Sequence, residues 1–554
     1  MPRPSSVTNS FAGAPALPRA SEAIRNQAWS LAFAEFVEAD RQSPLDPEDL
    51  EFLSVAAHLT GKDAESGEAL ARAHQGYLGR GEIRRAARCA GWLSVVAQLR
   101  GDSAQASGWL SRARRLLETE GDCVEKGYLL LPVGMAAAQQ RDLVAAHAAF
   151  VEVASIGQRF GDRDLASLAL QGQGRVLVRR GEIAGGVALL DEAMVAVTAG
   201  EVSPIVAGGI YCSVIDACGE IFDLRRAQEW TSALEQWWSS QPDMVPYRGH
   251  CLIRRAEIMQ LRGAWPDALL EARCACERLS QPVPKPAVGA AFYRKAEMHR
   301  LLGEEEEAEE AYRAAAQWER VPRPGVALLR LARGEVNGAQ SEIRHVVDVV
   351  IEPGKRAEAL AAQAEIAMAA HDLATARRAA GELSKIATKI GAEFLLAVAA
   401  CTHGAVLLAE GDAPTAVASL RQALATFRHL EAPYEAARVQ VCLSRAYRAL
   451  GNDESASHEL QAAREAFCKL GAATDLAHIE ELVDLSATSP AGPLTQREID
   501  VVKLVASGIT NREIAEKLKI SQKTVARHLN NIFNKLDLSS RAAATAYAYQ
   551  HGLL

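Results

Sequence analysis

The sequence predicts an all-α protein in which a long array of helical hairpins is followed by a small four-helix domain. Three observations support this prediction. The 554 residues are 49% hydrophobic but only 5% aromatic, a composition that favours helices over strands. One turn pattern returns about every forty residues along most of the chain, and several helix-start signals crowd into about the last sixty residues. A chain of this length exceeds one compact domain, so separate units are expected.

The N-terminal segment lacks the features of a secreted or membrane protein. Residues 1–20 contain several Pro, Ser and Ala residues and no long apolar core, so we expect a disordered tail rather than a signal peptide. No apolar run in the sequence reaches the roughly 18 residues that are needed to cross a bilayer. The sequence therefore predicts a cytoplasmic protein without membrane contact.

The repeat occupies residues 21–485. Each unit has a turn, usually Gly followed by Asp or Glu, and a small residue five positions after the turn residue. A turn residue that accepts positive φ ends one helix, the acid beside it favours the start of the next helix, and the small residue lets the two helices approach closely. The turn residues and their small partners are Gly101 and Ala106, Arg141 and Ala146, Gly181 and Gly186, Phe222 and Ala227, Gly263 and Ala268, Gly303 and Ala308, Gly334 and Ala339, His371 and Ala376, Gly411 and Ala416, and Gly451 and Ala456.

Each unit is predicted to be a helical hairpin that buries its apolar faces by stacking on its neighbours. The pattern resembles tetratricopeptide arrays, for example in the stretch from Gly303 through Ala308 to Tyr312. Most intervals are 40 or 41 residues, longer than the usual 34 of that family, so the resemblance implies a tetratricopeptide-like α-solenoid without fixing the repeat type. The interval that ends at Gly334 is shorter, which predicts an irregular unit there.

No group of residues in the sequence indicates catalysis or a bound cofactor. Cys274 and Cys276 form the only close cysteine pair, and no nearby His or further Cys completes a zinc site. The phosphate-binding pattern G-x-x-x-x-G-K-[ST] does not occur. We therefore expect no enzymatic activity, no metal and no cofactor.

Four tryptophans raise a ligand hypothesis for the solenoid. Trp230, Trp237, Trp238 and Trp265 could line a concave surface and stack on a sugar, an aromatic inducer or a peptide. The alternative is that Trp230 and Trp237, seven residues apart on one helix, pack between repeats. The second interpretation is favoured, because aromatic residues at helical spacing more often belong to the core.

Charge changes sign near the C-terminal end of the chain. Residues 486–493, with the sequence SATSPAGP, are predicted to form a flexible linker. The following residues 494–554 contain nine Lys or Arg and five Asp or Glu, a net charge of +4, whereas the preceding residues carry −12. Positive charge gathered in one small domain suits a polyanion such as nucleic acid.

Four helices are expected in this C-terminal domain. Thr495 with Glu498 and Thr510 with Glu513 both fit the capping box that begins a helix. Gly508 falls just past the first apolar stretch, where a residue with positive φ ends a helix.

The next two helices predict a DNA-binding arrangement. A short helix near 511–518, a tight turn at Lys519 and a third helix capped by Ser521 form a helix-turn-helix. Ser539 or Ser540 caps a fourth, Ala-rich helix.

The third helix presents one apolar and one polar face. Val525, Leu529 and Ile532 recur at helical spacing and are expected to face inward. No Asp or Glu occurs from residue 518 to residue 536, and an acid-free helix start attracts phosphate. Arg and Asn side chains can also bond two atoms of a guanine or adenine edge. The outward residues are Lys523, Thr524, Ala526, Arg527, Asn530, Asn531 and Asn534.

The C-terminal domain resembles the LuxR-type DNA-binding domain. This resemblance implies a recognition helix at 522–536 and a dimerising helix at 541–551. It also implies phosphate contacts from Lys523, Thr524 and Lys535, and base contacts near Arg527 and Asn530. The family often has Lys or Arg where this chain has Ala526, which could instead touch a thymine methyl. The residues that carry the resemblance are Leu494, Thr495, Arg497, Glu498, Gly508, Thr510, Asn511, Glu513, Ile514, Ala515, Ile520, Ser521, Lys523, Thr524, Val525, His528, Ile532, Lys535 and Leu536. The expected DNA-binding residues are Asn511, Lys523, Thr524, Ala526, Arg527, His528, Asn530, Asn531 and Lys535.

The sequence thus predicts a transcription regulator that binds specific double-stranded DNA, as a homodimer, and whose solenoid receives a small-molecule or protein effector. RNA polymerase is a further expected partner. The alternative is a protein-interaction scaffold with auxiliary or vestigial DNA binding, which Ala526 and the overall negative charge leave open.

Overall fold

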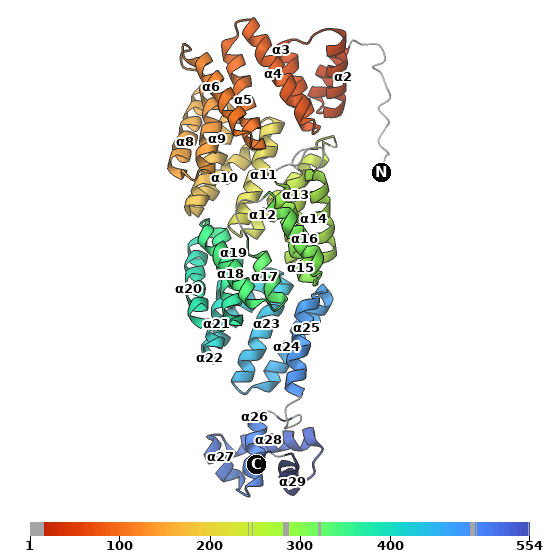
Figure 1. The fold of residues 1–554 in the computed structure, drawn as a ribbon, viewed down its shortest axis with the longest axis vertical. Helices are drawn as coiled ribbons and strands as arrows, with labels where there is room; N and C mark the ends of the chain where they lie inside the picture. Colours follow the sequence, from red (N-terminus) through yellow and green to blue (C-terminus); the bar gives the residue numbers. More distant parts are fainter. Residues whose placement is uncertain are drawn as a thin grey trace.

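The computed structural model describes residues 16–241, 243–245, 248–280, 287–318, 323–487, 494, 496–551 and 553. Within these residues all regular structure is helical: a solenoid of α1 to α25 precedes a separate group of four helices, α26 to α29 (Figure 1). The first half of the solenoid comprises α1 (Ala16–Arg25), α2 (Trp29–Gln42), α3 (Pro47–Leu59), α4 (Asp63–Gly79), α5 (Ile83–Arg100), α6 (Ser103–Leu117), α7 (Glu125–Gln139), α8 (Leu143–Phe160), α9 (Arg163–Arg180), α10 (Ile183–Thr198), α11 (Pro204–Glu220) and α12 (Leu224–Ser239). The second half comprises α13 (Arg248–Leu261), α14 (Trp265–Ser280), α15 (Val288–Leu302), α16 (Glu305–Ala316), α17 (Gly325–Ala332), α18 (Val336–Val349), α19 (Pro353–Ala369), α20 (Leu373–Ile390), α21 (Glu393–Ala409), α22 (Ala413–His429), α23 (Pro433–Ala449), α24 (Asp453–Leu470) and α25 (Ala473–Ala487). The C-terminal group comprises α26 (Gln496–Ala506), α27 (Asn511–Leu518), α28 (Gln522–Leu536) and α29 (Arg541–Gln550).

The predicted turns connect the two helices of each hairpin in the solenoid. All ten turn residues adopt positive φ, from 58° at His371 to 91° at Gly411, and all ten small residues are buried. In five of the ten turns the polar residue after the turn also caps the next helix directly, because its side chain accepts a hydrogen bond from a backbone N–H in the first turn. These capping residues are Asp142, Asp223, Asp372, Asp412 and Asn452.

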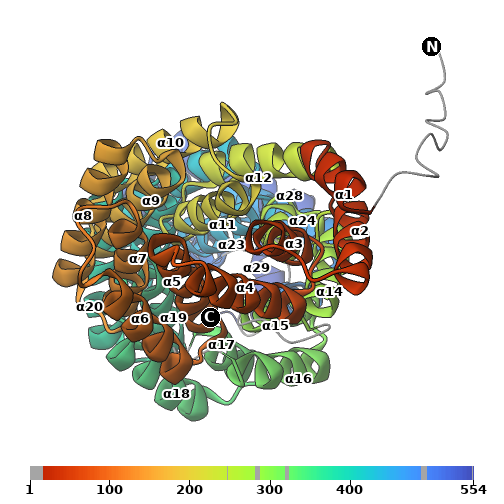
Figure 2. The same cartoon turned by 90° about the horizontal axis from the view of Figure 1, so that it is seen from above.

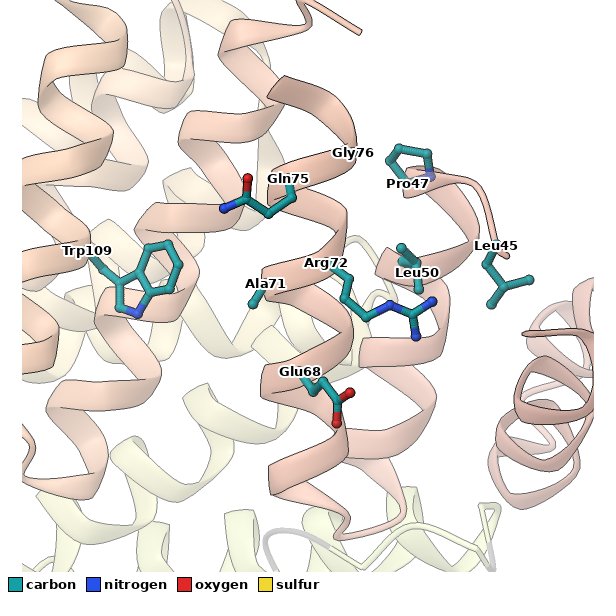
Figure 3. A pocket seen from close by; sticks show the side chains of 9 residues that line it. All are labelled: Leu45, Pro47, Leu50, Glu68, Ala71, Arg72, Gln75, Gly76 and Trp109. Carbon is teal, nitrogen blue, oxygen red and sulfur yellow. The ribbon is translucent and has the colours of Figure 1, made fainter. Parts of the chain in front are cut away.

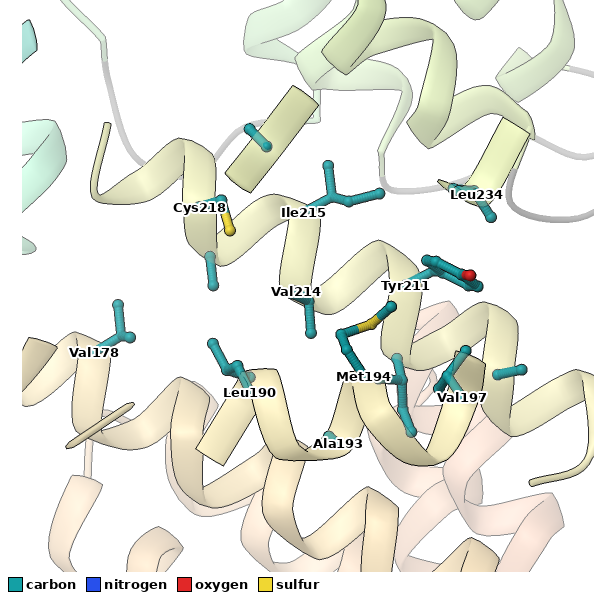
Figure 4. Close-up of a cluster of buried hydrophobic side chains, with 14 of the residues drawn as sticks. Val178, Leu190, Ala193, Met194, Val197, Tyr211, Val214, Ile215, Cys218 and Leu234 are labelled. Atoms are coloured by element: carbon teal, nitrogen blue, oxygen red, sulfur yellow. The ribbon is translucent and has the colours of Figure 1, made fainter. Parts of the chain in front are cut away.

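The core of the solenoid is continuous between neighbouring hairpins. In one cluster Leu190 and Met194 of α10 pack against Tyr211 and Ile215 of α11 (Figure 4), and all four side chains are at most 3% exposed. Full burial of a side chain of this size stabilises the fold by roughly 1.5–3 kcal/mol. Each hairpin therefore depends on its neighbour for stability.

The hairpins coil into a superhelix. Seen from above, α11, α15 and α23 lie nearer the centre, whereas α8, α16 and α18 lie at the rim (Figure 2). Ion pairs join the first helices of different hairpins. They link Arg175 to Glu220 at 2.8 Å, Arg254 to Asp216 at 2.8 Å, Arg294 to Glu257 at 2.5 Å, and Arg438 to Glu365 at 2.8 Å.

Successive turns of the superhelix touch one another. The indole Nε1 of Trp29 donates to Gln241 Oε1 at 3.0 Å although the two residues are 212 positions apart. Arg141 Nη2 likewise lies 3.8 Å from Glu352 Oε1, and these two residues are 211 positions apart in the sequence. The contacts show that one superhelical turn takes up about five of the forty-residue units.

The boundaries differ slightly from those expected. Helix α1 begins at Ala16, inside the segment predicted as a tail, and α25 extends to Ala487, so the first two residues of the predicted linker are helical. The remaining linker residues, 488–493, lie outside the described residues. The short helix α17, only eight residues long, accounts for the short interval before Gly334.

Candidate nucleic-acid interface

Local hydrogen bonds shape α27, the turn and α28. Thr510 and Glu513 form the predicted capping box, with the Thr510 N–H donating to Glu513 Oε2 at 2.6 Å. Lys519 adopts φ of 52° and closes the turn. Ser521 then caps α28, because its Oγ accepts from the Thr524 N–H at 3.1 Å. Thr495, the other predicted cap, lies outside the described residues.

The apolar face of α28 seats it on the domain core. Val525 and Ile532 are completely buried and Leu529 is 7% exposed. They pack in one cluster with residues of α26, α27 and α29, including Val502 and Ala544. The helix is therefore fixed in rotation, and this rotation decides which residues face outward.

Most of the residues predicted to contact DNA lie on the outward face of α28. Arg527, Asn530, Asn531 and Lys523 are exposed, and so is Ala526 between them. Thr524 is half-buried, and its hydroxyl lies 2.8 Å from Ser521 Oγ. The face thus offers positive charge and amide groups with no carboxylate on the helix itself, which is the chemistry that phosphates and base edges require.

Lys535 has a second role that the sequence did not reveal. Its Nζ donates to Glu498 Oε2 at 2.8 Å, and the Glu498 side chain is only 3% exposed, whereas the Lys535 side chain is 37% exposed. Lys535 therefore holds the end of α28 against α26. If its ammonium also contacts a phosphate, it does so while bound to Glu498.

Asn511 is also engaged inside the domain. Its Oδ1 accepts from Arg541 Nη1 at 2.8 Å, and Arg541 Nη2 donates to the carbonyl of Ile509. Arg497 Nη2 donates to the carbonyl of Leu518 at 2.8 Å. Arg497 and Arg541 are thus positioning residues for α27, and no local pattern in the sequence signals these bonds across the domain.

His528 lies half-buried on the side of α28. Burial lowers the pKa of its imidazole and outweighs the opposing effect of Glu498, and the nearby cations Arg527, Arg497 and Lys535 lower that pKa further. His528 is consequently neutral at neutral pH, and it would meet DNA as a hydrogen-bonding group rather than as a cation.

Helix α29 leaves one face uncovered. Ala544 and Ala548 are completely buried against the domain, whereas Ala542, Ala546 and Tyr549 are exposed, and Tyr549 is 68% exposed. The last three residues share one side of the helix by their spacing. These residues form an exposed, largely apolar strip along α29.

The four tryptophans do not form one surface. Trp230, Trp237 and Trp238 are partly buried against the α10–α12 core, and the Trp237 ring lies 5.6 Å from that of Tyr211. Trp265 belongs to another cluster, is completely buried, and donates its Nε1 hydrogen to Gln260 O at 3.0 Å. Trp265 thus packs in the core between α14 and its neighbours, and the other three tryptophans pack against the α10–α12 cluster.

A cleft of about 470 Å³ near the N-terminal end offers a further concave surface. Trp109 lies on one side of α4 and Leu45 and Pro47 on the other (Figure 3). The single arginine of the cleft, Arg72, makes two 2.7 Å hydrogen bonds to Asp40, so its charge is already satisfied. Over the described ranges, no helix is long and apolar enough to cross a membrane, and no three His, Cys, Asp or Glu side chains group as metal ligands.

Known proteins match the C-terminal domain. Residues 492–548 match the family described as bacterial regulatory proteins, luxR family. The transcriptional regulatory protein LiaR of Bacillus subtilis (strain 168) is 46% identical over 65 residues, which make up 12% of this chain and 31% of LiaR. The response regulator protein VraR of Staphylococcus aureus (strain NCTC 8325 / PS 47) is 44% identical over 61 residues, 11% of this chain and 29% of VraR. The chain therefore spans less than a third of the length of these relatives.

Two solved structures align over most of the chain with low scores. The APC/C hetero-tetramer Cut9–Hcn1 gives a TM-score of 0.36 at 12% identity, covering 83% of this chain and 95% of that chain. Yeast Tom70 gives a TM-score of 0.32 at 13% identity, covering 85% of this chain and 96% of that chain. Scores of this size do not establish a common fold, so the nature of the solenoid rests on its own hairpins.

The helix-turn-helix geometry and the family match agree on the C-terminal domain. The chain therefore consists of a tetratricopeptide-like α-solenoid with a LuxR-type helix-turn-helix DNA-binding domain at its C-terminal end.

Proposed function

We propose that this protein is a cytoplasmic transcription regulator that binds specific double-stranded DNA through α28, and that its solenoid receives a ligand or protein signal. One observation carries the proposal: the face of α28 that is turned away from the domain core bears Lys523, Arg527 and Asn530 and no acid. The family match over residues 492–548 supports the same function.

Each exposed residue has a distinct task in this proposal. Arg527 and Asn530 contact base edges in the major groove, where Arg can pair with guanine and Asn with adenine. Lys523 and Thr524, in the first turn of α28, contact phosphate together with the free N–H groups of the helix start. Ala526 leaves room for a thymine methyl.

The regulator binds as a dimer in this proposal. The exposed strip of Ala542, Ala546 and Tyr549 on α29 would pack against its copy, and the two α28 helices would enter major grooves about 34 Å apart. The operator would then consist of two related half-sites. Contact with RNA polymerase from the bound dimer is a further part of the proposal.

The test begins with selection of binding sites by full-length protein from a random duplex pool, followed by titration in several salt concentrations. Arg527→Ala should weaken binding to the selected site by roughly 1–3 kcal/mol and relax the preference at one or two positions. Lys523→Ala should weaken all sequences alike and reduce the salt slope by about 1. Lys469→Ala, which removes an exposed charge from the solenoid, is the matched control and should change neither quantity.

Failure would take a definite form. A wild-type protein that selects no sequence, and whose weak DNA binding is the same in both α28 variants, contradicts the proposal. If one protein partner then co-purifies with the chain in a fixed ratio, the result favours the alternative function of a protein-interaction scaffold.

A further inference from the structure

We propose that the cleft near the N-terminal end of the solenoid is a docking groove for residues 1–15 of the same chain, here called the leading segment. The leading segment precedes α1 and lies outside the described residues. The cleft has a volume of about 470 Å³, within the roughly 300–1,000 Å³ of pockets that hold small ligands. It therefore has room for a few side chains of a peptide.

The shape of the cleft suits an extended chain. Trp109 of α6 bounds it on one side of α4, and Leu45 and Pro47 bound it on the other (Figure 3). Between these walls α4 presents the small residues Ala71 and Gly76. Four extended residues span about 13 Å, which matches the roughly 10–12 Å diameter of a helix. An extended segment that crosses α4 here therefore reaches both walls.

The apolar walls match side chains of the leading segment. Trp109 and Leu45 are half-buried, so part of each side chain is exposed at the cleft. The leading segment, MPRPSSVTNSFAGAP, contains Phe11 and three prolines. Proline favours an extended backbone, and an aromatic pair such as Phe11 with Trp109 attracts beyond the apolar area that it buries.

The charge of the cleft also favours the leading segment. Arg72 donates two hydrogen bonds of 2.7 Å to Asp40, and the exposed Glu68 lines the cleft one helical turn away. These three side chains comprise two acids and one base, so they leave a net negative charge. The leading segment contains Arg3 and no Asp or Glu, so its charge is complementary.

The attachment point of the leading segment lies at the same end of the solenoid as the cleft. Helix α1 begins at Ala16, and Ala20 of α1 packs in the same core cluster as Leu50, which lines the cleft. Fifteen extended residues span about 50 Å, or four to five helix diameters. The leading segment therefore reaches the cleft of its own molecule without a second copy.

The first experiment measures the fluorescence anisotropy of a labelled peptide of residues 1–15, titrated with wild type and with a variant that lacks residues 2–14. A short tether gives an effective concentration of about 1 mM. A peptide dissociation constant of about 0.1 mM thus leaves the tethered segment about 90% docked. We expect the shortened variant to bind the peptide at about 0.1 mM or more tightly. Wild type should bind it at least about tenfold more weakly, because its own leading segment occupies the cleft.

Substitutions in the shortened variant locate the bound peptide. Trp109→Ala should weaken peptide binding at least about tenfold, whereas Trp318→Ala, which removes an exposed tryptophan outside the cleft, should leave it unchanged. Glu68→Lys changes only an exposed side chain and should weaken binding about two- to fivefold. This effect should disappear when the peptide carries Arg3→Gln. Glu65→Lys is the matched control, because Glu65 is exposed on α4 outside the cleft, and it should have almost no effect at 0.15 M salt.

The second experiment uses the full-length chain with photoreactive p-benzoylphenylalanine in place of Phe11. Irradiation should join residue 11 to α4, to α6 or to residues 43–50, within a product of monomer mass, and Trp109→Ala should abolish this product. Cross-links scattered over the solenoid, or a product of twice the mass that joins two chains at the cleft, would contradict docking within one chain. Equal peptide affinity of wild type and the shortened variant, or no binding to the shortened variant at about 1 mM, would also overturn the inference.

Discussion

Lys535 of α28 and Glu498 of α26 form an ion pair of 2.8 Å in which the carboxylate is almost completely buried. Removing the lysine leaves a buried negative charge without its cation, which is more harmful than removing both groups. Because Lys535 is partly exposed, we expect Lys535→Met to destabilise the C-terminal domain by about 1–3 kcal/mol rather than by the full value for a buried pair. Hydrogen exchange of the 522–536 peptide in the full-length protein measures this as faster exchange.

The double variant Lys535→Met with Glu498→Gln provides the decisive comparison. It should exchange more slowly than the single lysine variant, because no unpaired charge remains. If the single and double variants exchange equally fast, the pair does not hold α28.

His528 gives the C-terminal domain a predictable response to acid. Because burial lowers its pKa in the folded domain, the unfolded chain takes up a proton first as the pH falls below about 6.5. The stability of the domain should therefore fall with pH below this value and be unaffected by His528 above it. We expect the hydrogen-exchange rates of α28 in wild type and in His528→Gln to differ at pH 5.5 and to agree at pH 7.5. Because the two proteins are compared at the same pH, the pH dependence of the intrinsic exchange rate cancels. A difference that is constant across this range would contradict the lowered pKa.

The sequence predicted the local features of the recognition domain well. The cap at Ser521, the capping box at Thr510 and the positive φ of Gly508 each depend on residues close in sequence. The contacts of Lys535 and Asn511 were missed, because their partners lie 37 and 30 positions away on other helices. No local sequence pattern indicates which residues this far apart in the chain will be in contact.

In the solenoid, too, the sequence predicted the local features but not the contacts between distant residues. The turns followed from one repeated pattern, but the ion pairs between inner helices were missed. A signal for them existed: Asp216 and Arg254 are 38 positions apart, and Glu257 and Arg294 are 37 apart, which is close to one repeat. Opposite charges about one repeat apart are therefore a sequence signal for ion pairs between neighbouring units. The contacts between superhelical turns had no such signal, because their offset depends on the pitch of the superhelix.

Glu435, at the start of α23, should make the solenoid less stable as pH rises. Burial raises its pKa to about 7, against smaller opposing effects of its own backbone N–H and of Arg438. The folded state thus keeps a proton that the unfolded chain releases near pH 4.5, so stability is fully present below that pH and is lost as pH rises toward 7. Glu435→Gln should remove this loss, raising stability at pH 8 by roughly 2–3 kcal/mol and leaving it nearly unchanged at pH 4.5.

Differential scanning calorimetry at the two pH values tests the effect of Glu435. Glu431→Gln is the matched control, since the Glu431 side chain is 73% exposed and should have little influence at either pH. Equal melting temperatures of wild type and Glu435→Gln at pH 8 would show that the buried carboxyl keeps an ordinary pKa.

Gly354, in the first turn of α19, should tolerate no side chain. A Cβ at this position would overlap the backbone carbonyl oxygen of Glu220 at the end of α11, and backbone cannot move aside as a flexible side chain does. Alanine normally stabilises a helix by about 1 kcal/mol relative to glycine, but here the clash should outweigh that gain and destabilise the solenoid by about 1–3 kcal/mol. Gly381→Ala in α20 is the matched control, because nothing lies within 4 Å of its added Cβ, and it should raise the melting temperature slightly. The two substitutions are chemically identical, so opposite shifts in calorimetry would show that the close contact between α19 and α11, rather than helix propensity, sets the requirement at Gly354. A rise for both would mean that α11 and α19 do not pack this closely in solution.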